Sequence, residues 1–234
     1  MFGGAISGGG GGSATPEWAT LLSLHGASFA QAGTPVTSAN SFDTGTGIFS
    51  FTFANTTVNS NGFRESDHYD IPILSIDPTF DPLTHLLEVE FEPTTRPVGG
   101  LDAAFQVGFI SADSPENGVG LVYTNTAAAP TYVLHEQTTT GLGINAALTG
   151  VGSPGYAWYR FFAMDNDEEV RFAASYHNGT TWDLALTRDG LAYTARTAWY
   201  LRIGASKPSS ANANGQIFAG KVRYKIVPLG AVPR

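Results

Sequence analysis

The 234-residue sequence contains no cysteine, only two methionines and few charged residues, which make up 14% of the chain. Without cysteine the protein has neither disulfides nor a thiolate zinc site, so its stability must come from its core. Low charge combined with 28 glycines and 13 prolines excludes a coiled coil or a helical bundle. The same composition suits many short strands joined by turns.

Basic residues are scarce in the first 150 positions, which hold 14 Asp and Glu but only 2 Lys and Arg. Residues 151–234 hold 10 basic and 6 acidic residues, and the whole chain has a net charge of −8. We expect no nucleic-acid partner, because phosphate contacts need clustered Lys and Arg. The asymmetry favours either head-to-tail contacts with a neighbouring molecule or two halves whose charges mix within one fold.

The N-terminus lacks the basic and apolar regions of a secretory signal, and no apolar run reaches 18 residues, so we expect no membrane partner. Residues 1–16 form a glycine-rich zone in which apolar residues precede a glycine run: Phe2, Ile6, Gly8, Gly9, Gly10, Gly11 and Gly12. Two interpretations stay open for this zone, an arm that docks on a partner and a loose tail or linker. Residues 17–46 are interpreted as a connecting segment, with a loop at 34–41, and 47–234 as one β-sandwich domain.

From residue 47 onward, apolar and polar residues alternate with the two-residue period of a half-buried strand. Asn178-Gly179 and Asp189-Gly190 are dipeptides that favour the positive φ angles of tight hairpin turns. The pattern predicts an all-β antiparallel sandwich, or jelly roll, with no convincing helix. Strands are expected at 48–53, 71–76, 85–92, 103–111, 118–124, 130–136, 142–149, 156–164, 168–176, 182–187, 198–205 and 216–227.

Two charged triplets have the spacing that puts alternate residues on one face of a strand. Glu88, Glu90 and Glu92 form an acidic face, for which we expect exposure to solvent. Lys221, Arg223 and Lys225 form a basic face, interpreted as a solvated surface or as the charged edge of a sheet. Paired carboxylates also occur in glycosidases, so the acidic triplet is the one candidate for catalysis.

No metal or other cofactor is expected. Two groups of oxygen ligands could be considered for calcium, but neither has the spacing of an EF-hand loop. The groups are Asp67, Asp70, Asp77 and Asp81, and Asp165, Asn166, Asp167 and Glu168. The five histidines show no i, i+4 or His-x-His spacing, and neither a phosphate loop nor a Gly-x-Ser-x-Gly motif is present.

The C-terminal third carries a series of weak motifs in a characteristic order. Tyr156–Phe162 is followed by a turn of the form aromatic-x-Asn-Gly-x-x-Trp at Tyr176–Trp182 and by Trp199-Tyr-Leu-Arg-Ile-Gly. In this order the motifs resemble the concanavalin A-like lectin/glucanase jelly-roll superfamily, most clearly over 156–227 and plausibly back to residue 47. The resemblance implies a two-sheet sandwich whose members often bind glycans and sometimes cleave them.

The resemblance points to Trp182, Tyr176 and Asn178 as candidate glycan-binding residues, because aromatic rings stack on sugars. Trp158 and Trp199 are expected in the core. Glucanases of this superfamily carry Glu-x-Asp-x-(x)-Glu on a strand, and Glu90 replaces the Asp here. We therefore expect a protein that is not an enzyme.

By analogy with phage proteins that join a docking arm to such a sandwich, we expect a structural virion protein of a bacteriophage-like particle, a tail-tip, fibre or head-decoration component. It would be assembled in the host cytoplasm, would contact other virion proteins and would be a homo-oligomer. The sandwich would recognise a host-surface polysaccharide or decorate the particle. The alternatives are a free carbohydrate-binding module and a glycoside hydrolase or polysaccharide lyase.

Overall fold

A computed structural model gives the architecture of the chain. It describes residues 17–31, 35–54, 67–80, 85–95, 103–111, 118–125, 130–138, 141–148, 159–166, 169–177, 182–192, 199–206 and 215–228. Among these residues, no helix has the length and apolar character needed to cross a membrane.

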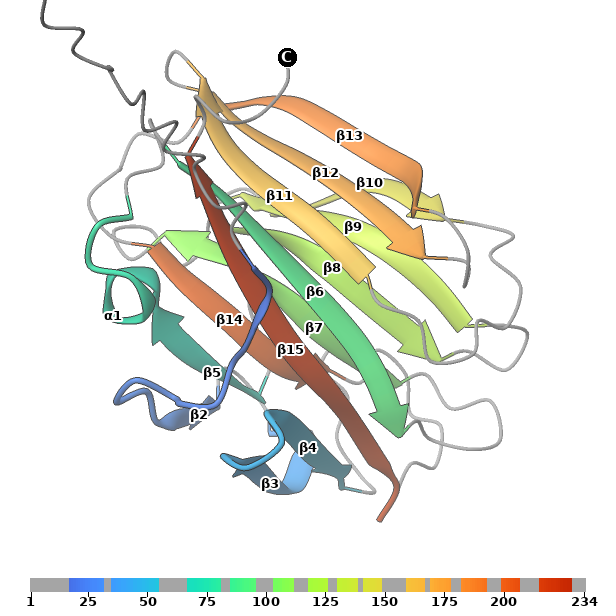
Figure 1. Ribbon diagram of the computed structural model, residues 1–234. Helices are drawn as coiled ribbons and strands as arrows, with labels where there is room; N and C mark the ends of the chain where they lie inside the picture. Colours follow the sequence, from blue (N-terminus) through green and yellow to red (C-terminus); the bar gives the residue numbers. More distant parts are fainter. Residues whose placement is uncertain are drawn as a thin grey trace, which may run out of the picture.

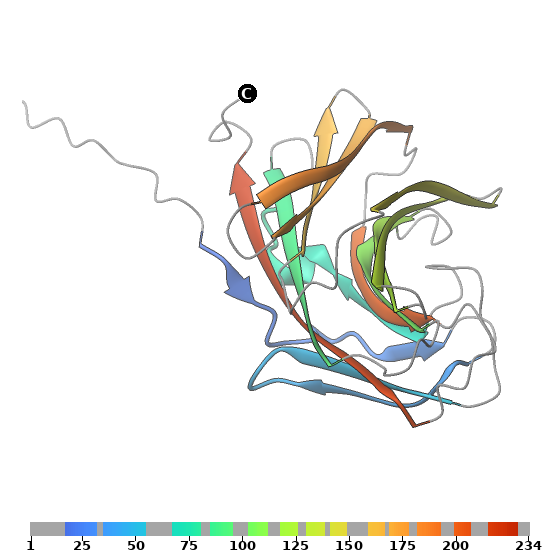
Figure 2. The same cartoon turned by 90° about the vertical axis from the view of Figure 1, so that its right-hand side faces the viewer.

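Within the described residues, fifteen strands form two antiparallel sheets that lie face to face (Figures 1 and 2). Sheet A runs in the order β13 (Trp182–Ala192), β12 (Glu169–His177), β11 (Tyr159–Asn166), β6 (His85–Thr95), β15 (Ile217–Pro228), β4 (Ile48–Phe53) and β3 (Thr37–Asp43), and β1 (Ala19–Thr20) also pairs with β15. Sheet B runs in the order β10 (Gly141–Leu148), β9 (Pro130–Thr138), β8 (Gly118–Asn125), β7 (Ala103–Ser111), β14 (Trp199–Ser206), β5 (Asp67–Pro72) and β2 (Phe29–Gln31). The predicted all-β sandwich is confirmed.

The core lies between the sheets and is built from alternate residues of each strand. Phe49, Phe51 and Phe53 of β4 are fully buried, and so are Leu201 and Ile203 of β14. Aromatic rings meet across the gap: Phe91 of β6 and Phe105 of β7 stack with ring centroids 4.3 Å apart. Alternate residues of the same strands therefore form the two outer faces of the sandwich.

Three local predictions are wrong. Residues 37–43 form strand β3 instead of a loop, because a strand at the edge of a sheet can consist of polar residues. Residues 73–76 form the short helix α1 (Ile73–Ile76), since strand β5 ends at Pro72. Asp189-Gly190 lies inside β13, at a bulge where the pairing steps from Val170–Leu191 to Phe172–Arg188.

Candidate functional site

The acidic and basic triplets face each other on neighbouring strands of sheet A. Glu88, Glu90 and Glu92 of β6 lie directly opposite Lys225, Arg223 and Lys221 of β15, in that order. Lys225 Nζ lies 2.6 Å from Glu88 Oε2, and Arg223 Nε lies 2.5 Å from Glu90 Oε2. We call these six residues the charge ladder.

The expected exposure of the acidic face is wrong, because Glu90 is fully buried and the Glu88 residue is only 8% exposed. The basic triplet is not at an edge either, since β15 lies between β6 and β4. Sequence spacing predicted that each triplet shares one face but not that the two triplets are partners. Pairing between strands so far apart in the chain leaves no local pattern in the sequence.

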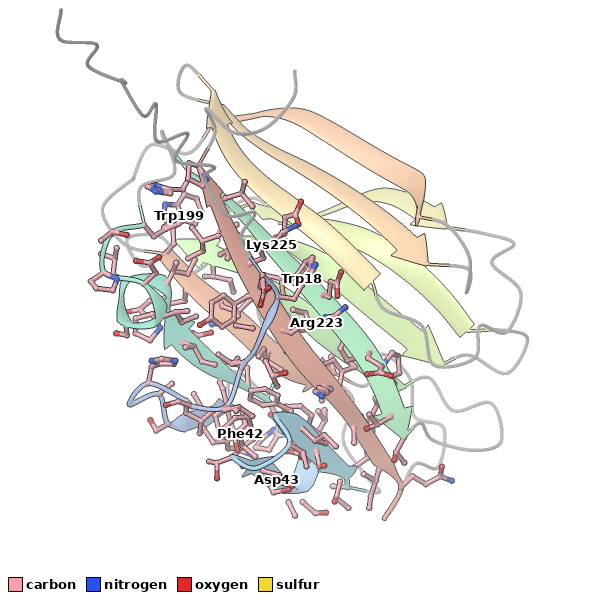
Figure 3. All side chains as sticks on the ribbon, viewed as in Figure 1. Trp18, Phe42, Asp43, Trp199, Arg223 and Lys225 are labelled. Carbon is pink, nitrogen blue, oxygen red and sulfur yellow. The ribbon has the colours of Figure 1, made fainter. Side chains whose placement is uncertain are left out.

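Trp18, which the sequence analysis did not single out, covers the ladder. Its ring centroid lies 5.3 Å from Arg223 Cζ and 4.8 Å from Lys225 Nζ, within the range of cation–π contacts (Figure 3). The neighbouring Ala19 and Thr20 pair with Tyr224 and Arg223 of β15. The acidic residues of β6 are therefore paired with basic side chains of β15, and the ring of Trp18 lies over those basic side chains.

The outer face of sheet B carries a second polar cluster, on β14 and β5 near the β2 end of the sheet. Arg202 of β14 forms two hydrogen bonds with Asp70 of β5, Nε to Oδ1 at 2.7 Å and Nη2 to Oδ2 at 2.6 Å. His68 Nε2 lies 3.3 Å from the same Asp70 Oδ2. The Arg202 and His68 side chains are each 5% exposed, whereas that of Asp70 is 26% exposed. Asp70 is therefore the member of this trio that is most open to solvent.

The environment of Asp70 keeps its carboxylate ionised. Burial alone would raise its pKa, but hydrogen bonds from Arg202 and His68 and the charges of both residues outweigh burial. The net result lowers the pKa of Asp70 from 3.8 to about 2. The cluster thus contains an ionised carboxylate whose position is fixed by two hydrogen bonds from Arg202.

Gln106 of β7 extends the cluster along sheet B. Its Nε2 lies 2.6 Å from Ser206 Oγ, and it is completely buried. Its Oε1 accepts no hydrogen bond in the described part of the chain. A buried acceptor left without a donor is costly, so Gln106 lowers the stability of this part of the sheet.

Two glycines on neighbouring strands, β7 and β8, lie beside the cluster. Gly108 of β7 lies opposite Arg202 on one side and opposite Gly120 of β8 on the other. Half-buried Tyr200 is two residues from Arg202 along β14 and therefore lies on the same face. Gly108 is itself buried, so Tyr200 and Asp70 are the more exposed residues on this part of the face.

The structure separates the residues predicted to bind a glycan. Trp182 lies opposite His177 at the end of the β12–β13 hairpin, whereas Tyr176 lies opposite Asp183 and Tyr159. Tyr176 and Trp182 therefore occupy neighbouring, not identical, rows of the sheet. Asn178 lies outside the described residues. Trp199 is buried, as predicted.

The remaining predicted residues have other partners or lie outside the described part of the chain. Asp67 Oδ2 accepts hydrogen bonds from the backbone of Val36 and Thr37, and Asp77 accepts two from Thr79. No group of three metal-ligating side chains gathers within the described residues. Outside them lie Asp81, Trp158, Asp167, Glu168 and the predicted arm with Phe2, Ile6 and the glycines at 8–12.

No protein-family model and no curated protein sequence matches the chain. Its fold is similar to that of the CBM2 module of the evolved Dit protein of Lactobacillus casei BL23 phage J-1, with a TM-score of 0.53 and 8% identity over 94% of this chain and 99% of that one. Proteins of unknown function from Shewanella oneidensis MR-1 (TM-score 0.52, 12% identity, 94% and 90% covered) and Saccharomyces cerevisiae (0.50, 8%, 88% and 97%) share it as well. The chain thus has a β-sandwich fold that is also used by carbohydrate-binding modules.

Proposed function

We propose that this protein is a carbohydrate-binding component of a phage-type virion, attached to the particle through its N-terminal segment. The observation that carries the proposal is the fold shared with the phage Dit module over nearly the whole of both chains. We assign this chain to a virion by analogy with that phage protein.

We place the carbohydrate on the outer face of sheet B. Asp70, the most exposed member of the cluster, is an ionised acceptor whose position is fixed by Arg202 and His68, so it complements a sugar hydroxyl that donates. Half-buried Tyr200 lies on the same face, and aromatic rings commonly stack on sugars. The β12–β13 hairpin with Trp182 is the competing location.

Binding assays with the full chain test both locations. We expect saturable binding to at least one polysaccharide on a glycan array or among purified bacterial surface polysaccharides. Tyr200→Ala should weaken it at least tenfold if sheet B carries the site, and Trp182→Ala should do so if the hairpin does. Leu74→Ala, which removes an exposed apolar side chain on α1, is the matched control. Absence of binding to every polysaccharide would overturn the proposal.

Attachment to the particle has its own test. Deleting residues 1–16 should abolish incorporation into particles while leaving the sandwich folded, as judged by its circular dichroism spectrum and melting temperature. Normal incorporation of the shortened chain would contradict attachment through this segment. The self-association expected of a virion protein is measured on the same samples by their mass in solution.

The geometry of the acidic triplet supports binding without hydrolysis. A retaining glycosidase needs one carboxylic acid that holds a proton and one carboxylate open to the sugar. Glu88 and Glu90 are instead ion-paired with Lys225 and Arg223, and both residues are buried, so neither carboxylate is open to a sugar. We therefore expect no turnover of any bound polysaccharide, and detectable hydrolysis that is lost in Glu88→Gln would overturn this part of the proposal.

A further inference from the structure

We propose that residues 17–21 form a strap that fixes the N-terminal segment to the outer face of sheet A, and that Trp18 is the residue that holds the strap in place. The inference deepens the proposed function, because it assigns the attachment to one side of the domain. It concerns residues that no part of the carbohydrate site uses.

The backbone of the strap is fixed at its inner end. Ala19 and Thr20 pair with β15, and the Leu21 amide donates to the Val222 carbonyl at 3.0 Å. Leu21 itself is 1% exposed and belongs to the core. The strap therefore leaves the core at Leu21 and continues over the outside of β15.

The turn between β3 and β4 packs against the same segment. Gly47 has a φ of +72°, and a Cβ placed there would lie 2.5 Å from Thr20 Cγ2 and 2.7 Å from the Leu21 carbonyl oxygen. Only a residue without a side chain allows this close approach. The inner end of the strap is thus held from two directions.

Only two residue pairs connect β1 to β15, which is too short a ladder to hold a strand by backbone bonds alone. The indole ring of Trp18 supplies the additional contact by lying over Arg223 and Lys225 (Figure 3). Ion pairs with Glu90 and Glu88 fix the positions of the two cations, so the ring meets a preformed surface. The basic residues of the charge ladder thereby form the surface on which Trp18 packs.

The strap and the carbohydrate cluster lie on opposite sides of the sandwich. Figure 2 shows β1 beside β15 on the side of sheet A that faces away from sheet B. Arg202 and Asp70 occupy the outer face of sheet B. A partner that holds the chain through residues before Glu17 would therefore lie on the sheet A side and leave the proposed sugar-binding face free.

Hydrogen exchange of the full chain tests the strap without any glycan or virion. Trp18→Ala should speed amide exchange in residues 19–21 at least tenfold while leaving β14 unchanged. Trp18→Phe, which keeps an aromatic ring, should stay near the wild type, and Trp18→Leu, which keeps only apolar cover, should resemble Trp18→Ala. Leu22→Ala, which shortens an exposed neighbour, is the matched control.

Since the chain has no cysteine, spin labels can be attached at introduced cysteines without removing any native thiol. Glu17→Cys paired with Ser50→Cys on β4 should give a narrow distance distribution that broadens when Trp18→Ala is added. Unchanged exchange and unchanged distances in Trp18→Ala would overturn the strap, as would equal loosening of β14. A strap that is confirmed while all glycans fail to bind would leave only the proposed function wrong.

Discussion

Glu90 of β6 and Arg223 of β15 are 133 residues apart in the sequence, yet they lie directly opposite each other and form an ion pair. Lys225 with Glu88 and Arg202 with Asp70 repeat the arrangement, each joining an acidic residue of the first 150 to a basic residue of the remainder. The uneven charge of the two halves is thus at least partly neutralised inside one fold. Of the two interpretations of that asymmetry, these pairs favour the one in which the halves fold together.

Removal of either partner of the Glu90–Arg223 pair should destabilise the protein unequally. Glu90 is fully buried whereas the Arg223 side chain is 30% exposed, so loss of the ion pair costs more when the buried glutamate is the residue that remains. We expect Arg223→Gln to cost about 3 kcal/mol and Glu90→Gln about 1–2 kcal/mol in urea unfolding at pH 7. Glu17→Gln, which alters an exposed carboxylate, is the control, and equal costs for both partners would contradict the prediction.

Asp70 should make the protein sensitive to acid. Because the pKa of its carboxyl group is lowered from 3.8 to about 2, its stabilisation is complete above pH 3.8 and is lost as the pH falls through about 2. The shift corresponds to about 2 kcal/mol. We expect Asp70→Asn to lower the free energy of unfolding at pH 6 and to flatten its decline between pH 4 and pH 2, as measured by urea unfolding. Parallel curves for the two proteins would count against this origin of acid sensitivity.

Gly220→Ala should be strongly destabilising, although it adds a single methyl group. A Cβ at Gly220 would lie 2.0 Å from Cε2 of the Phe91 ring, which is itself stacked on Phe105 in the core. Such overpacking costs about 1–3 kcal/mol. Thermal unfolding should show a clear loss for Gly220→Ala and a partial recovery when Phe91→Leu is added. At exposed Gly45 the same change meets only the Asp43 carboxylate, at 3.2 Å, so a comparable loss there would argue against a steric cause.

Asp67 should be needed to hold the start of β3. Its Oδ2 accepts hydrogen bonds from the Val36 amide at 3.0 Å, the Thr37 amide at 2.7 Å and the Thr37 hydroxyl at 2.5 Å. Asp67→Ala would leave these buried donors without an acceptor and should cost about 3–4 kcal/mol. Asp67→Asn keeps one acceptor oxygen and should cost about half as much. Chemical denaturation measures both, and a harmless Asp67→Ala would show that water replaces the carboxylate.

Most strands from residue 85 onward could be predicted from the sequence to within a few residues. The strand at 103–111 was predicted with its observed bounds, and β14 and β15 are each shifted by one residue. Apolar–polar alternation and turn residues are local features of the sequence, so they indicate strands even when the fold is not known. Strand β3 was missed because its exposed polar residues carry no such signal.

The candidate site was far less predictable. The motif at 176–182 pointed to both Tyr176 and Trp182 as glycan-binding residues. The strand register instead places them in neighbouring rows, with Tyr176 opposite Asp183 and Trp182 opposite His177. His68, Gln106 and Arg202 come from three strands that are distant in the sequence and meet only because β5, β14 and β7 are neighbours in sheet B. Trp18 gave no signal because its partners lie more than 200 residues further along the chain.

The sequence by itself determined the fold class, because period-two alternation, glycine-rich turns and low charge permit strands and disfavour helices. It also determined that each charged triplet shares one face of its strand, since that follows from a strand's geometry alone. Only the tertiary structure decided that the two triplets neutralise each other beneath Trp18, and that the arginine cluster lies on the other sheet. Which strands become neighbours depends on how the whole core packs, and no stretch of the chain carries that information locally.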